Sequence, residues 1–255
     1  MAVRKPVIHA RDHSHGGADP VHIAWEDVGG TTTLADKIVA LLTGSDGFWK
    51  LNETSGTTAA DSSGNGYTMS PRSGLGPPSW ANAATPYSEN SPVFGGSTNE
   101  QQATLPVLSG DLTLFCWAQK STDIDCSLLG QGPGNTSGCY LNWNNSASLS
   151  SAFELLIGGA TLHAVPSNVG YPAGAGWHMV AGTRTSSVWR LYVDGAVQTA
   201  TYTDSGGSYT PAATGAWIGL LPGGTLSTAF HLSYCTILHH ALTAAEITDL
   251  WTASL

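Results

Sequence analysis

The spacing of apolar residues divides the chain into three stretches. Residues 1–33 show neither an alternating nor a helical apolar pattern, and two Gly-Gly pairs interrupt them. Such a stretch cannot bury a core of its own, so we predict an extended N-terminal arm. Residues 34–45 show helical spacing and predict a short connecting helix. Residues 46–255 show short apolar segments separated by Gly, Asn, Asp and Pro clusters, as an antiparallel β-sandwich requires.

Two helices have recognisable ends. Thr33 is a candidate N-cap for the connecting helix, and Gly44 is a candidate stop. Near the C-terminus, Thr243 and Glu246 have the spacing of a capping box, in which each residue's side chain bonds the other's backbone N–H. We predict that a second short helix closes the sandwich there.

One hairpin stands out among the predicted strands. Val188 to Val193 and Ala196 to Tyr202 are both strand-like, and Asp194-Gly195 lies between them. Because Asp-Gly tolerates the positive φ angles of a type I′ turn, we predict a tight two-residue connection.

The composition agrees with a folded, mainly β chain. Of 255 residues, 41% are hydrophobic and nine are Trp, whereas only 11% are charged and 31 are Gly. The formal net charge is -9, and the Lys and Arg residues form no stripe that could neutralise phosphates. We therefore expect no nucleic acid partner.

We also expect no membrane insertion. No apolar run reaches the roughly 18 residues of a transmembrane helix, and the N-terminal sequence lacks the apolar segment of a secretory signal. A protein made and left in the cytosol suits a virion component that assembles in the host cytoplasm and leaves by lysis.

The four cysteines lack the C-x-x-C spacing of zinc or redox sites. Cys116 and Cys235 lie in strand-like segments, where a reduced thiol packs as a small hydrophobe. Cys126 and Cys139 flank a loop, and the sequence leaves open whether they are buried thiols or form a disulfide.

Several separated motifs occur in the order of a known family. They are the opening strand and turn from Phe48 to Gly66, then Leu112 to Trp117, Gly176 to Gly182, Leu191 to Gly195, and Ala241 to Ile247. Together they resemble the laminin-G-like, concanavalin A-like jelly-roll family over roughly Gly47 to Trp251. The resemblance implies an all-β, two-sheet antiparallel jelly roll with a lectin-type role.

The arm has a resemblance of its own. The segment from His9 to Val21, HARDHSHGGADPV, resembles a histidine and Gly-Gly-x-Asp motif of phage tail fibres. This resemblance implies a homotrimer in the virion tail, joined through the arm to other tail or baseplate proteins.

Two metal sites are candidates. His13 and His15 lie on one side of an extended chain, so three arms about a threefold axis would offer six ring nitrogens to a transition metal. Alternatively, these histidines make turn hydrogen bonds in a polar arm. Asp61 and Asn65 could bind calcium in a Gly-rich turn, although such residues also dominate turns because they bond their own backbone.

A sugar site needs an aromatic face and a few polar groups beside it. Four aromatic residues lie in stretches rich in Asn and Ser and are candidates for this role: Trp80, Tyr87, Tyr140 and Trp143. Trp143 also fits the core, as do Trp49, Trp117 and Trp177, which lie inside strand motifs.

Catalytic motifs are absent from the sequence. The chain has no Glu-x-Asp-x-x-Glu strand of the kind found in sandwich glucanases, and no Gly-x-Ser-x-Gly elbow. We therefore expect a non-enzymatic phage tail adhesin that attaches the virion to a host cell-wall glycan. The alternatives are a virion structural or decoration protein that binds no sugar, and a glycan depolymerase.

Overall fold

The computed structural model describes residues 33–42, 46–84, 90–95, 99–106, 110–122, 125–132, 138–144, 151–158, 162–204, 215–219 and 229–254, without the side chains of residues 81–84. All of these residues belong to one compact unit, Thr33–Leu255. The predicted arm, with His13 and His15, lies outside the described residues, as does Tyr87.

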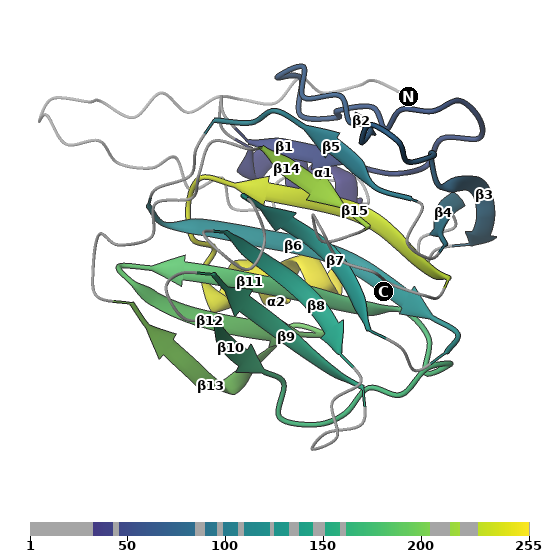
Figure 1. The fold of residues 1–255 in the computed structure, drawn as a ribbon. Helices are drawn as coiled ribbons and strands as arrows, with labels where there is room; N and C mark the ends of the chain where they lie inside the picture. The colour runs from purple at the N-terminus through teal and green to yellow at the C-terminus, as the bar shows by residue number, and fades with distance from the viewer. Residues whose placement is uncertain are drawn as a thin grey trace, which may run out of the picture. The chain divides into compact units, whose positions relative to one another are not determined.

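The described strands form two antiparallel sheets that pack face to face (Figure 1). Sheet I has eight strands in the order β13-β12-β11-β6-β15-β4-β3, with β1 paired to β15. They are β1 (Gly47–Trp49), β3 (Ser79–Ala84), β4 (Asn90–Phe94), β6 (Leu112–Lys120), β11 (His178–Thr185), β12 (Val188–Val193), β13 (Ala196–Thr203) and β15 (Phe230–Leu238).

Sheet II has seven strands in the order β10-β9-β8-β7-β14-β5-β2. They are β2 (Ser70–Pro71), β5 (Gln101–Ala103), β7 (Cys126–Gln131), β8 (Cys139–Asn144), β9 (Ala152–Ile157), β10 (His163–Pro166) and β14 (Ala216–Ile218). The arrangement confirms the predicted all-β jelly-roll sandwich.

Strand β6 shows how one segment serves two apolar layers. Leu114 and Cys116 point into the core between the sheets, whereas Phe115 and Trp117 point to the opposite side of sheet I. Because side chains alternate along a strand, a continuous apolar run predicts that both faces are covered. Trp49 and Trp117 are buried, as the sequence predicts, but Trp177 is only partly buried at the edge of the second layer.

Two helices cover the outward side of sheet I. Helix α1 (Leu34–Leu41) and helix α2 (Ala244–Thr252) pack there through Ile38, Ile247 and Leu250. Both begin with a capping box, on Thr33 and on Thr243, which confirms the predicted helix starts. In Figure 1, α2 lies behind the strands of sheet II. Neither described helix is long and apolar enough to cross a membrane.

The hairpin between β12 and β13 also has the predicted turn. Asp194 and Gly195 both have positive φ, 50° and 77°, as a type I′ turn requires. The Asp194 carboxylate accepts bonds from the Met179 backbone N–H at 2.9 Å and pairs with His178 Nδ1 at 2.8 Å. The turn is therefore bonded to the start of β11.

The cysteines are buried thiols, and none of the four forms a disulfide. In the antiparallel pairing of β7 with β8, Cys126 is opposite Trp143 and Cys139 is opposite Gln131. Cys126 and Cys139 therefore lie at opposite ends of the strand pair, so the disulfide left open by the sequence is not formed.

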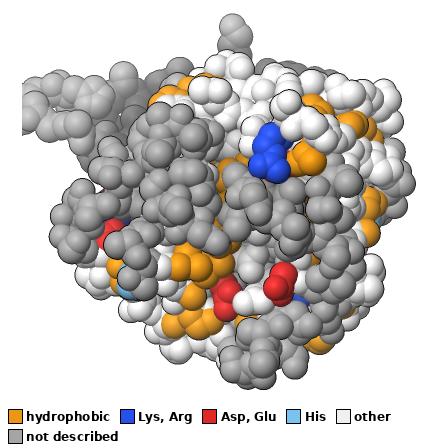
Figure 2. All heavy atoms as spheres, in the orientation of Figure 1, with side chains coloured by type: hydrophobic (Ala, Val, Ile, Leu, Met, Phe, Trp, Pro, Cys, Tyr) orange, Lys and Arg blue, Asp and Glu red, His pale blue; other side chains and the backbone are white. Residues whose placement is uncertain are grey.

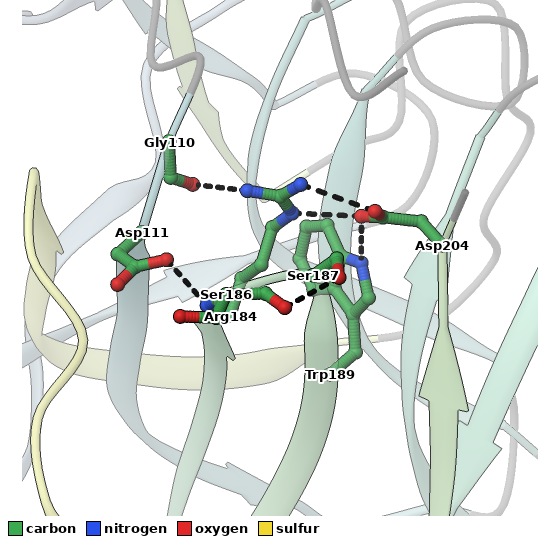
Figure 3. A network of polar contacts seen from close by, with 7 residues as sticks. All are labelled: Gly110, Asp111, Arg184, Ser186, Ser187, Trp189 and Asp204. Atoms are coloured by element: carbon green, nitrogen blue, oxygen red, sulfur yellow. Dashed lines mark hydrogen bonds and ion pairs between the residues drawn. The ribbon is translucent and has the colours of Figure 1, made fainter. Parts of the chain in front are cut away.

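A buried ion pair ties β11 to the end of β13 (Figure 3). Arg184 donates to both carboxylate oxygens of Asp204, at 2.7 and 3.1 Å, and also to the Gly110 carbonyl at 2.9 Å. The indole N–H of Trp189 donates to the same carboxylate at 2.9 Å. With side chains only 7% and 6% exposed, Arg184 and Asp204 are satisfied by each other and by these neighbours.

Candidate functional site

The outer face of sheet II carries polar side chains on its central strands. In β8 and β9, the neighbours of Asn142 and Glu154 along the chain point into the core between the sheets. Asn142 and Glu154 therefore point outward. Ser127 on β7 points the same way, since Cys126 and Leu128 on either side of it belong to the core. This alternation places three polar residues of three adjacent strands side by side.

Asn142 and Glu154 form the centre of this outer face. They are directly opposite each other in the pairing of β8 with β9, and Asn142 is opposite Ser127 on β7. The Ser127 hydroxyl donates to Asn142 Oδ1 at 3.2 Å, and Asn144 Nδ2 donates to Glu154 Oε2 at 3.1 Å. Each bond fixes one end of an amide or carboxylate group. Asn142 is only 8% exposed, whereas Glu154 is partly exposed.

The remaining atoms form a donor and an acceptor next to each other. Among the described residues, Asn142 Nδ2 has no acceptor and Glu154 Oε1 has no donor. Directly opposed residues of an antiparallel pair have Cβ atoms about 5 Å apart. An adjacent donor and acceptor match a sugar hydroxyl pair, because each hydroxyl both donates and accepts a hydrogen bond.

An aromatic cluster borders these polar groups. Tyr140 and Trp217 point outward from β8 and β14, with ring centroids 5.6 Å apart, and Leu156 of β9 joins them. A side chain at Gly130, between the two rings on β7, would overlap Trp217. Tyr140 and Trp217 are only 3% and 1% exposed. Their rings are therefore buried beside the polar side chains and offer no exposed face on which a sugar could stack.

The electrostatics of the face centre on Glu154, which is partly exposed. Burial raises the pKa of its carboxyl group, and the nearby charge of Asp125 raises it further, while the bond from Asn144 lowers it. Burial, together with the charge of Glu154, also raises the pKa of Tyr140 to about 12. Figure 2, which looks onto this side, shows acidic side chains close to hydrophobic ones near its lower centre.

The three predicted sugar-binding aromatics among the described residues, Trp80, Tyr140 and Trp143, are not brought together. Trp143 is fully buried between the sheets, where its indole N–H donates to Ser151 and Tyr171 and Lys120 lies 4.5 Å from its ring centre. It therefore offers no ring face to a sugar and belongs to the core, the alternative that the sequence had left open. Tyr140 points outward from the same strand because it is an odd number of residues away.

Trp80 lies on a different part of the molecule. It belongs to β3, at the edge of sheet I, whereas Tyr140 belongs to the centre of sheet II. Its ring is half-buried against the core, and its N–H donates to the Gly56 carbonyl at 2.9 Å. A sugar-binding role for Trp80 thus stays a prediction, separate from the group around Asn142 and Glu154.

The Gly-rich turn holds Asp61 by hydrogen bonds within the chain. Its carboxylate accepts from the Ser63 N–H and hydroxyl, both at 2.8 Å, and from the Tyr67 N–H at 2.9 Å. Asn65 Nδ2 donates to the Asp46 carbonyl at 2.9 Å. Among the described residues, no three His, Cys, Asp or Glu side chains are placed to hold a metal. The carboxylate fits its turn rather than an ion, and calcium at Asp61 and Asn65 stays a prediction.

Sequence reasoning assigned no role to Asn142 or Glu154. A signal was present, because Asn142 and Asn144 alternate with apolar residues in one segment and Glu154 interrupts an apolar run in the next. That alternation indicates an outward face, but only the pairing of β8 with β9 shows that these residues are neighbours.

Comparisons with known proteins agree with this architecture. A family model described as the concanavalin A-like lectin/glucanases superfamily matches residues 94–248. No curated protein sequence matches the chain.

Solved structures match the fold at low identity. The botulinum neurotoxin serotype D ligand binding domain in complex with N-acetylneuraminic acid has a TM-score of 0.59 and 12% identity, over 84% of this chain and 52% of that chain. The binding domain of Paraclostridial Mosquitocidal Protein 1 has a TM-score of 0.60 and 11% identity, over 80% and 51%. Trypanosoma rangeli sialidase has a TM-score of 0.59 and 17% identity, over 83% and 33%. The chain thus spans about half of the toxin chains and a third of the sialidase chain, and the likeness concerns the fold.

Proposed function

The chain belongs to the concanavalin A-like lectin/glucanase superfamily, and from this premise we propose that it is a non-enzymatic phage tail adhesin that binds a host surface glycan. The observation that carries glycan binding is a donor on Asn142 and an acceptor on Glu154 that have no hydrogen-bond partner among the described residues. A ligand that is rich in hydroxyl groups satisfies both atoms at once.

The position of the two residues supports a binding role. They lie on adjacent central strands of a two-sheet sandwich, each held by a bond from a neighbouring side chain. Groups fixed in this way lose little side-chain entropy when a ligand binds. The toxin domain that was solved with N-acetylneuraminic acid shares only its fold with this chain, so it supports the proposal no further than that.

The virion part of the proposal rests on the arm. Its histidine and Gly-Gly-x-Asp segment, His9 to Val21, resembles tail-fibre motifs. We propose that the arm joins the chain to other tail or baseplate proteins and assembles a homotrimer, whose three weak sugar sites act together. Antibodies against the chain should label the tails of purified virions.

Substitution of the two central residues tests glycan binding. Glu154→Gln should weaken binding of the full chain to host cell walls roughly 10- to 150-fold, because a hydrogen bond to a charged group contributes about 1.5–3 kcal/mol. Asn142→Ala removes a neutral donor, whose hydrogen bond contributes about 0.5–1.5 kcal/mol, so it should weaken binding roughly 2- to 10-fold. Asp249→Asn is the matched control, since it changes an exposed acid on α2, which packs on the other sheet. Thermal unfolding of each variant should stay close to that of the parent.

The same assay separates the alternatives. A decoration protein would bind no host wall, and its variants would be indistinguishable from the parent. A depolymerase would release reducing ends from host glycan over time, which the adhesin should not do. Binding that survives both substitutions would mean that the glycan binds elsewhere, and Trp80 would be the next residue to substitute.

A further inference from the structure

Two of the four cysteines lie side by side at the centre of sheet I. The pairing of β6 with β15 is interrupted by a β-bulge between Ser233 and Thr236. Tyr234 and Cys235 occupy this bulge and together face Cys116 on β6. Tyr234 points to the outer side of the sheet, whereas Cys235 and Cys116 both point into the core between the sheets. The two cysteine side chains are therefore cross-strand neighbours on the same face.

The two thiols are in direct contact. A hydrogen bond joins the side chains of Cys116 and Cys235, and both residues are fully buried. The bulge is held in place, because the Tyr234 N–H and the Ser233 hydroxyl both donate to the Lys50 carbonyl, at 3.2 and 3.0 Å. Facing residues of an antiparallel pair have Cα atoms about 4.5–5.5 Å apart, within the roughly 4.4–6.8 Å that a disulfide spans. This pair can therefore be linked without a large backbone movement.

The other two cysteines are not placed in this way. Cys126 and Cys139 lie at opposite ends of the pairing of β7 with β8, where Cys139 is opposite Gln131. Five residues along β7 correspond to about 17 Å, too far for a disulfide between them. Since all four cysteines are buried, Cys126 and Cys139 provide an internal comparison for the pair in sheet I.

We propose that Cys116 and Cys235 form a disulfide under oxidising conditions, which links β6 to β15 inside the folded chain. The oxidant is a small-molecule disulfide such as oxidised glutathione. One cysteine thiolate attacks it and releases one glutathione thiolate, and the other cysteine thiolate then attacks the mixed disulfide and releases the second. The two cysteines lose two electrons and two protons, and one glutathione disulfide becomes two glutathione thiols. This inference does not rest on the proposed glycan binding.

Burial should make the reaction slow in the native chain. Neither thiol is exposed, and burial raises the pKa of Cys235, so little of the reactive thiolate is present. Exchange therefore has to begin from an opened state, in which β15 has separated from β6. A chain that folds among reducing agents would keep both thiols and form the disulfide only after transfer to an oxidising medium. A tail protein that leaves its host by lysis undergoes this transfer.

The disulfide should stabilise the sandwich. It closes a loop of roughly 120 residues between two strands of sheet I, and a cross-link over a loop of this length removes much conformational entropy from the unfolded chain. We expect the temperature of unfolding to rise by roughly 5–15 °C when the reduced chain is oxidised.

Refolding in a glutathione buffer tests the proposal without the delay caused by burial. The full chain is denatured in urea and refolded with reduced and oxidised glutathione, and the remaining thiols are alkylated before peptide mass spectrometry. We expect one disulfide, between Cys116 and Cys235, with Cys126 and Cys139 alkylated. The native chain in the same buffer should give the same product more slowly, and faster with a little urea. A refolded chain with all four thiols alkylated, or with another pair linked, would overturn the proposal.

Alanine variants show what the disulfide does to stability. Cys116→Ala and Cys235→Ala should each unfold at the same temperature with and without reductant, whereas Cys139→Ala should keep the difference shown by the parent. Cys139 is the matched control, because its thiol is also fully buried. Each variant is compared with its own reduced form, so any loss of stability from the missing thiol itself cancels. An oxidised parent that is no more stable than the reduced parent would contradict the link between β6 and β15, and it would leave the proposed glycan binding untouched.

Discussion

Trp117 joins sheet I to α2. Its ring is 1% exposed and stacks on Trp251, with ring centroids 5.3 Å apart and planes at 18°. Trp117→Ala should lower the free energy of unfolding by about 3–5 kcal/mol, because truncation of a buried aromatic removes burial and leaves a cavity. Denaturant unfolding measures this directly, and a change near zero would mean that α2 does not pack on Trp117 in solution.

Asp204 compensates the buried charge of Arg184 (Figure 3). Asp204→Ala should cost about 3–5 kcal/mol of stability, because it leaves a buried guanidinium without its partner. The double variant Asp204→Ala with Arg184→Met should recover part of that loss, since no uncompensated charge remains. A double variant less stable by the sum of the two single losses would show that the two residues act independently.

Gly195 is constrained both by its backbone and by α2. Its φ is 77°, and a Cβ there would come within 3.0 Å of three Trp251 atoms. Gly195→Ala should cost more than the roughly 1–2 kcal/mol of left-handed strain alone. Gly174 is the matched control, because its φ is 79° but a Cβ would meet nothing within 4 Å. Equal losses in thermal unfolding of the two variants would show that α2 does not press on the hairpin.

Local chemistry predicted the helix starts and the hairpin. A capping box at Thr243 and the Asp194-Gly195 turn each depend on residues close together in sequence, which a single chain reveals. The direction of Trp143 and Tyr140 was harder to predict. The two residues are three apart on one strand and point to opposite sides, and the start of that strand decides which one points into the core between the sheets.

The site itself depends on contacts between segments. Glu154 and Asn142 are 12 residues apart, and their pairing follows from the register of β8 with β9. The family resemblance predicted the jelly roll, but sequence neighbours alone could not show that Asn142 and Glu154 lie opposite each other on adjacent strands.

The arm should control assembly. Imidazole binds metal only when it is neutral, so if His13 and His15 hold a metal on a trimer axis, the trimer should dissociate below about pH 6 and on adding a chelator. The double variant His13→Ala with His15→Ala should give a smaller mass in light scattering, with thermal unfolding of the sandwich unchanged. A variant that stays trimeric, with no metal found by elemental analysis of the parent, would reject the metal but not the adhesin.

The central claim is that a glycan binds at Asn142 and Glu154 on the outer face of sheet II. A crystal structure of the full chain with an oligosaccharide that it binds in solution tests this claim most directly. We expect sugar hydroxyl or amino groups within about 3 Å of Glu154 Oε1 and Asn142 Nδ2. A sugar bound elsewhere, such as on Trp80 at the edge of sheet I, with Asn142 and Glu154 left in water, would contradict it.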